Sequence, residues 1–239
     1  MGARMDGTID RRFVGGVLLA GGVLAMVGNG LHPILDPDSG ATQLVAIAGD
    51  TAYWSALHLV VVLAVVLLTA GTVLFARGFT GTAGESAAWL AAVLAVIGGS
   101  IFALQLGGLD GAVMTVLAEE LAAGGDEAAL TATASAMAAL DVGLLGIVTI
   151  VYLGGTFVAL GWAMHVTAIS APWIRWTALV AGGAGVVVGT LMYLRVADGV
   201  AFYGFRLVAL AVTVAALGLA VELRRSEAPA GVPTSAAPA

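Results

Sequence analysis

Long apolar runs dominate the chain, and short polar stretches separate them. The runs long enough to cross a lipid bilayer lie at residues 13–31, 54–76, 87–109, 142–164, 173–194 and 203–223. Each is near the roughly 20 residues that a helix needs to span a hydrocarbon core of about 30 Å. The first run exceeds the usual length of a signal-peptide core, and no clear cleavage site follows it, so we expect a retained helix. The pattern predicts an all-α integral membrane bundle of six transmembrane helices.

The connection at residues 110–141 differs from the others. Alanine, leucine and glutamate fill GAVMTVLAEELAA and DEAALTATASAMAAL, and these residues favour helix. The only strong break between them is Gly124 and Gly125. We therefore expect the third and fourth helices to continue beyond the membrane as a helical hairpin. Gly124 or Gly125 would end one helix and Asp126 would cap the next.

Composition supports a membrane protein and excludes several chemistries. The chain is 60% hydrophobic and only 10% charged, whereas soluble domains carry about a quarter charged residues. It has no cysteine, which excludes disulfides, thiolate metal sites, iron–sulfur clusters and a cysteine nucleophile. Its net charge of −6 argues against a nucleic-acid partner. The expected partner is the lipid bilayer, with a further membrane subunit or a second copy of the chain as candidate protein partners.

The arginines predict an orientation, because positive charge collects on the cytoplasmic side of membrane proteins. If the N-terminus is inside, only Arg195 and Arg206 face outward, and the cytoplasmic arginines are Arg4, Arg11, Arg12, Arg77, Arg175, Arg224 and Arg225. We then expect a plasma-membrane protein with both termini cytoplasmic. It would consist of an N-terminal segment (1–12), a transmembrane domain (13–223) and a disordered tail (224–239).

Aromatic residues, which gather at membrane interfaces, fit the same orientation. The predicted inner belt is Trp89, Trp162, Trp173 and Trp176, and the predicted outer belt is Tyr53, Trp54, Tyr193 and Tyr203.

Two glycine-rich segments share a spacing. They are AGGVLAMVG at 20–28 and AGGAGVVVG at 181–189. One interpretation is a duplicated unit, as in transporters built from internal repeats. The other is that small residues lie where helix backbones approach closely.

A cluster of polar residues is expected at the outer ends of the helices. Counted from the hairpin turn, Asp110 and Asp141 fall at similar heights, and Arg195 and Arg206 lie at the same level. Because an ionisable residue at membrane depth usually finds a partner, we expect Arg206 to pair with Asp110 or Asp141. With Gln105 and the nearby His58, the cluster is either the floor of an outward-facing pocket or proton-relay site, or an interhelical pair that fixes packing.

His32 and His58 raise a second question, because both fall near the outer side. Two imidazoles on adjacent helices can hold a haem, or can bind a copper or zinc ion with Asp36 or Asp50 as a third ligand. The chain has neither CxxCH nor HExxH. Since helices commonly stop before proline, His32 before Pro33 is also explained as a helix end.

The remaining motifs favour a non-enzymatic protein. The chain lacks a G-x-S-x-G elbow, a P-loop and a dinucleotide fingerprint. We expect an accessory subunit, a sensor or a small-molecule binder. The alternatives are a haem- or metal-binding redox protein using His32 and His58, and a small transporter with a pocket formed by Asp110, Asp141 and Arg206.

Four short motifs carry a resemblance. They are LHP at 31–33, WSALH at 54–58, LDG at 109–111 and AEELA at 118–122. In this arrangement the chain resembles a broad group of uncharacterised multi-pass membrane proteins of high-GC prokaryotes, over most of the first four helices. The resemblance implies a membrane bundle without an assigned activity, and it transfers no site residue.

Overall fold

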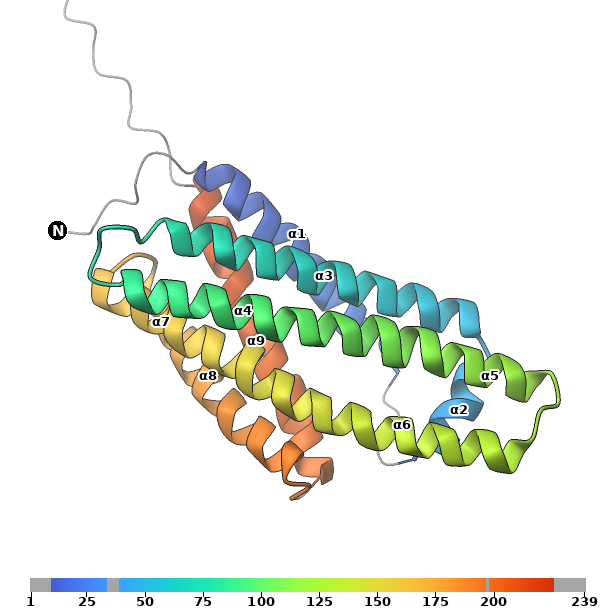
Figure 1. Ribbon diagram of the computed structural model, residues 1–239. Helices are drawn as coiled ribbons and strands as arrows, with labels where there is room; N and C mark the ends of the chain where they lie inside the picture. The colour runs from blue at the N-terminus through green and yellow to red at the C-terminus, as the bar shows by residue number, and fades with distance from the viewer. Residues whose placement is uncertain (1–9, 34–38, 197, 226–239) are drawn as a thin grey trace, which may run out of the picture.

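The computed structural model describes residues 10–33, 39–196 and 198–225, almost all of which are helical (Figure 1). The helices are α1 (Arg11–Leu31), α2 (Gly40–Ala48), α3 (Thr51–Arg77), α4 (Glu85–Leu104), α5 (Met114–Ala122), α6 (Glu127–Val148), α7 (Thr156–Thr167), α8 (Pro172–Tyr193) and α9 (Asp198–Arg225). Two π-helical segments complete the fold: η1 (Gln105–Val113) joins α4 to α5, and η2 (Thr149–Gly155) joins α6 to α7.

The predicted all-α bundle is confirmed. Within the described residues, six helices are long and apolar enough to cross a membrane, and each coincides with one of the predicted runs. The fifth ends at Tyr193, one residue before the predicted end. Large apolar side chains lie exposed on their outer faces, among them Leu59, Leu63, Val93, Ile97, Val180 and Leu207. A soluble monomer rarely exposes so much contiguous apolar surface, whereas lipid tails cover it at no cost. The chain is a multi-pass membrane protein.

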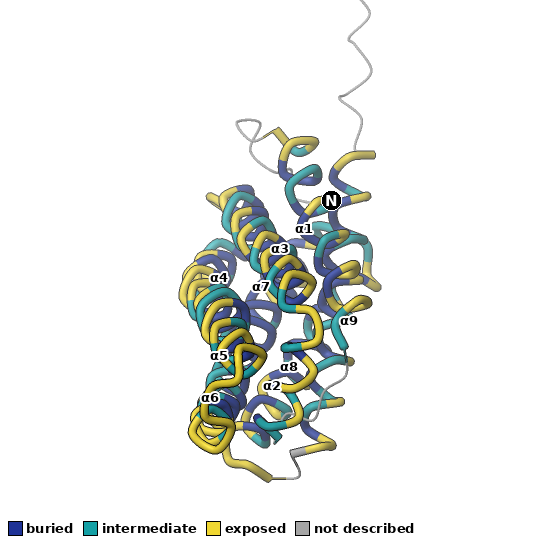
Figure 2. The backbone as a smooth tube through the Cα atoms, turned by 90° about the vertical axis from the view of Figure 1, so that its right-hand side faces the viewer, coloured by how far each residue is buried: buried dark blue, intermediate teal, exposed yellow. Residues whose placement is uncertain are grey.

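The six spans form a closed ring. Along the ring, α1 contacts α3, α3 contacts α4, and α4 contacts the continuous helix made of α6, η2 and α7. That helix contacts α8, α8 contacts α9, and α9 returns to α1. Buried residues line the inside of the ring along most of its length (Figure 2). Arg11 and Arg225 lie at one end of the bundle, and the turn between α5 and α6 lies at the other, here called the hairpin end (Figure 1).

The predicted helical hairpin is confirmed in its length and in its turn. The continuous helices Glu85–Ala122 and Glu127–Thr167 have 38 and 41 residues, well beyond the roughly 20 that a bilayer core requires. Gly124 adopts a left-handed φ of 85°, which glycine reaches without a steric penalty. The Asp126 carboxylate then accepts hydrogen bonds from the backbone N–H groups of Ala128 and Ala129, both at 3.1 Å. It therefore caps α6 as the sequence predicts.

Helix α2 is absent from the sequence-based expectations. It has only nine residues, too few to span a membrane, and it lies between the first two predicted spans. Its Leu44 and Ile47 are fully buried against Met114, Ala118 and Ala134 of the hairpin. Helix α2 thus fills the space beside α5 and α6, forming a second, smaller core at the hairpin end.

The glycine-rich segments lie where helix backbones approach closely. A Cβ atom on Gly21 would be 2.9 Å from the backbone nitrogen of Leu68 in α3. One on Gly182 would be 2.7 Å from the backbone nitrogen of Val158 in α7. Such distances leave no space for a side chain, so these glycines set the spacing between helices. This geometry agrees with the packing interpretation of both segments.

Some sequence-based expectations lie outside the described residues. These are most of the N-terminal segment (1–12), all but two residues of the tail (224–239), and the candidate metal ligand Asp36.

Candidate ligand-binding cavity

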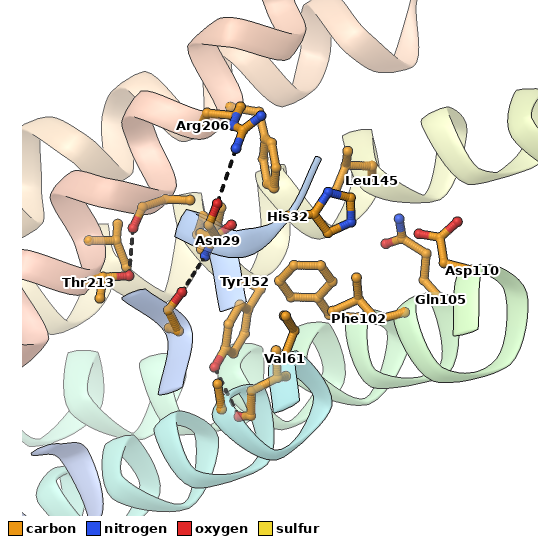
Figure 3. Close-up of a pocket in the computed structure, with 18 of the residues that line it drawn as sticks. Asn29, His32, Val61, Phe102, Gln105, Asp110, Leu145, Tyr152, Arg206 and Thr213 are labelled. Atoms are coloured by element: carbon orange, nitrogen blue, oxygen red, sulfur yellow. Dashed lines mark hydrogen bonds between the residues drawn. The ribbon is translucent and has the colours of Figure 1, made fainter. Parts of the chain in front are cut away.

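A cavity of about 140 Å³ lies inside the ring, toward the hairpin end (Figure 3). Its walls come from α1, α2, α3, α4, η1, α6, η2, α7 and α9. Its apolar part is lined by Val61, Phe102, Leu145, Leu153, Phe157 and Phe205, among others, and its polar part by Asn29, His32, Gln43, Gln105, Asp110, Asp141 and Arg206. Asn29 is exposed, so the polar part reaches the surface of the protein.

The two π-helical segments position important parts of the wall. Gln105 and Asp110 belong to η1, and Tyr152 belongs to η2. In η1 the N–H of Met114 donates to the carbonyl of Leu109, five residues earlier, instead of four as in an α-helix. Such wide turns change the direction of side chains and are frequent at functional sites.

Asp110 and Asp141 lie at the same part of the cavity wall, as their similar distances from the hairpin turn predict. Both line the cavity and are close enough to interact electrostatically. The amide nitrogen of Gln105 donates to Asp141 Oδ1 at 2.8 Å. Gln105 is only 1% exposed, and its Oε1 has no hydrogen-bond partner among the described residues. The structure thus brings these three residues together at one place in the wall.

Trp54 is buried, so its predicted place at the membrane interface is wrong. It is 5% exposed because the hairpin and α2 cover it, with Leu44 and Met114 in the same small core. Its indole nitrogen donates to the backbone carbonyl of Asp110 at 2.7 Å. Trp54 thus ties α3 to η1 and fixes the backbone from which the Asp110 carboxyl projects.

His58 lies behind this wall, between Trp54 and Asp110. It is 1% exposed, and its Nδ1 lies 2.9 Å from the carbonyl of Trp54. A carbonyl can only accept, so Nδ1 is the donor and carries the proton, which leaves Nε2 of the neutral ring as an acceptor. This Nε2 lies 3.9 Å from Asp110 Oδ2 and has no hydrogen-bond partner among the described residues.

His32 follows α1 and lines the cavity. Its Nδ1 donates to the carbonyl of Pro33 at 2.9 Å, so its Nε2 is also an acceptor when the ring is neutral. Burial lowers the pKa of His32; the hydrogen bond to Pro33 opposes this effect, and the positive charge of Arg206 adds to it.

The histidines do not have the geometry of a haem-binding pair. The ring centroids of His32 and His58 are 5.3 Å apart in an edge-to-face contact, which leaves no room for a haem plane between the rings. In the described part of the chain, no group of three His, Asp or Glu side chains could hold a metal ion. The two rings instead pack with Trp54 as an aromatic cluster.

The predicted ion pair of Arg206 is wrong. Arg206 donates to the backbone carbonyl of Asn29 at 3.2 Å, and it pairs with neither Asp110 nor Asp141 (Figure 3). The reason is that α9 packs against α1, whose last carbonyls lack helical partners and attract a cation. Arg195 is exposed just after α8, in a left-handed conformation with φ of 57°, and it does not line the cavity.

The deep part of the cavity is apolar, and the polar groups there have partners. Thr69 donates to the hydroxyl of Tyr152 at 3.2 Å, and this hydroxyl lies 3.3 Å from the carbonyl of Val65, to which it donates. Phe102 packs against the Tyr152 ring. The acceptor of the lining that has no partner among the described residues, Gln105 Oε1, therefore lies at the polar part of the cavity.

Comparisons with known proteins add no relative: no family model matches the chain, and neither a curated protein nor a solved structure matches it significantly. The resemblance carried by the short motifs stays a prediction, and function must be inferred from the cavity itself.

Proposed function

We propose that the protein is a small-molecule-binding membrane protein whose ligand occupies the cavity inside the ring. The observation that carries this proposal is the combination of an apolar interior with a buried acceptor in the cavity wall, Gln105 Oε1, that has no partner among the described residues. Leaving a buried polar atom unpaired costs about 1–3 kcal/mol, so a wall that keeps such an atom is well suited to a ligand that satisfies it.

A binding role fits the rest of the bundle better than a pore. Toward the end opposite the hairpin, Phe75, Phe79 and Met164 are fully buried inside the ring and close it with apolar packing. Near the cavity, the hydroxyl of Ser55 is hydrogen-bonded to Thr115 Oγ1, at 3.0 Å, and is not paired with a histidine. These features support a sensor or an accessory binding protein.

We further propose that the hairpin end faces outward and that both termini are cytoplasmic, so that the cavity opens on the outer side of the plasma membrane. Arg11, Arg77, Arg175 and Arg225 all belong to helix ends on the side of the bundle opposite the hairpin, which supports this orientation under the positive-inside rule.

The first experiment measures thermal unfolding of the protein in phosphatidylcholine nanodiscs with neutral, cationic and anionic small probes. Ala209 lines the cavity on α9, and Ala209→Phe would fill it. Val214, on the same helix, is 42% exposed, and Val214→Phe is the matched control. We expect at least one class of probe to stabilise the wild type and the control but not Ala209→Phe. No stabilisation of the wild type by any probe would contradict the proposal.

A further inference from the structure

We infer that the cavity binds a small primary amine, whose ammonium group lies against Asp110 and Asp141 and whose apolar body, about the size of one aromatic ring, lies against Phe102 and Tyr152. This inference rests on the proposed binding function and names the chemical class of the ligand.

The first support is a surplus of acceptors. The carboxyl of Asp110 is 17% exposed and receives no hydrogen bond from any side chain that the structure describes. Gln105 Oε1, which also lines the cavity, has no donor among the described residues either. The side chains of Gln105, Asp110 and His32 converge on the same region of the cavity (Figure 3). An ammonium group supplies three donors and no acceptor, which matches this set.

The second support is that most neighbouring donors are already used. The indole of Trp54 donates to the Asp110 carbonyl, and the amide of Gln105 donates to Asp141. Arg206 stands on the α1 side and donates to Asn29. The lining holds two carboxyl groups and one guanidinium, and a cation bound beside the carboxyl groups would favour their charged form.

An organic cation fits better than a bare metal ion. The described residues offer no three acidic or histidine side chains arranged around one point. Phe102 and Tyr152 line the same cavity and can pack against the apolar body of an organic cation, which a bare metal ion lacks. A volume of about 140 Å³ is close to that of an engineered apolar cavity that admits benzene. The ligand body is therefore small.

The test uses three probes of one size. Benzylamine carries an ammonium group, benzyl alcohol has the same ring and methylene without charge, and benzoate reverses the charge. Each is titrated calorimetrically into the full chain in phosphatidylcholine nanodiscs, with empty nanodiscs subtracted. Because a hydrogen bond to a charged group contributes about 1.5–3 kcal/mol, we expect benzylamine to bind about tenfold or more tightly than benzyl alcohol. Benzoate should bind weakest.

Variants test the two carboxylates separately. Asp110→Asn and Asp141→Asn keep the shape of the side chain and remove its charge, so each should reduce the preference for benzylamine to about threefold or less. The control is Glu119→Gln, which changes an exposed carboxylate on α5 outside the cavity. It should keep the full preference. Circular dichroism and monodispersity identify any variant that does not fold. If one of the two aspartate variants fails to fold, the preference of the other for benzylamine decides whether the carboxylates bind the ammonium group.

The outcomes separate this inference from the proposed function. If benzyl alcohol or benzoate binds as tightly as benzylamine, the cavity binds ligands but the ammonium assignment is wrong. The ammonium assignment is equally wrong if both folded carboxylate variants keep the wild-type preference. If none of the three probes binds and none of the wider panel stabilises the protein, both proposals are overturned.

Discussion

At the scale of single residues, His32 links the end of α1 to the cavity. Its ring touches the rings of Trp54 and His58 and lies near the guanidinium of Arg206. These surroundings disfavour a second proton on the ring. The pKa of His32 is therefore lowered, chiefly by burial, from its ordinary value of 6.5.

This lowered pKa predicts a dependence of stability on pH. In the unfolded chain His32 takes up a proton as the pH falls through about 6.5, but in the folded protein it resists until a lower pH. The folded state is therefore not penalised by His32 above about pH 6.5. Below that pH the unfolded chain binds a proton that the folded protein does not, and the free energy of unfolding falls. We expect wild-type thermal stability to fall more steeply between pH 7 and pH 5 than that of His32→Asn, in which the side chain cannot titrate. Parallel pH profiles would contradict this expectation.

Sequence reasoning placed Asp110, Asp141 and Gln105 at one level because height along a helix follows from counting residues away from a turn. It failed for Trp54 and Arg206 because the direction in which a side chain points around a helix depends on neighbours. Trp54 is covered by α2, a helix that the sequence pattern does not predict. Arg206 turns toward the backbone carbonyls at the end of α1. Unpaired acceptors such as Gln105 Oε1 could not be foreseen, since they depend on the position of every nearby donor.

At the scale of elements, α8 offers a test of how glycines set helix spacing. A Cβ atom on Gly189 would lie 2.7 Å from both the carbonyl oxygen of Gly146 and the backbone nitrogen of Ile150. These are backbone atoms, so Gly189→Ala must separate α8 from α6, and we expect it to destabilise the protein by about 1–3 kcal/mol.

The control for this prediction lies on the same helix. A Cβ atom on Gly183 would meet nothing within 4 Å, so Gly183→Ala should be neutral or stabilising by up to about 1 kcal/mol. Unfolding monitored by tryptophan fluorescence compares the two variants. Equal losses of stability would show that close packing at Gly189 is not the cause.

The long spans were predictable because about 20 apolar residues in sequence have few other stable conformations. The π-helical segments could not be predicted, because the sequence of a mostly apolar span does not show whether one of its turns holds an extra residue. A glycine pair inside each segment, Gly107–Gly108 in η1 and Gly154–Gly155 in η2, is the one feature that could have drawn attention to them.

At the scale of the whole molecule, the orientation can be tested directly because the chain has no cysteine. Ala123 lies exposed in the hairpin turn, and Thr80 lies exposed in the loop between α3 and α4 at the other end. We expect a membrane-impermeant maleimide to label Ala123→Cys in intact cells and Thr80→Cys only after permeabilisation. The opposite pattern would place the cavity on the cytoplasmic side.

The π-helical segment η1 has a consequence for how such a site arises. A π turn holds about one residue more than an α turn, and each residue of an α-helix corresponds to a rotation of about 100°. Deletion of a single codon between Gln105 and Asp110 would turn the two side chains relative to each other by about that angle. The span that contains η1 would lose one of its 38 residues and keep its apolar character. In this architecture, two chains that differ by one residue in η1 can share the same membrane bundle and still present different side chains to its interior.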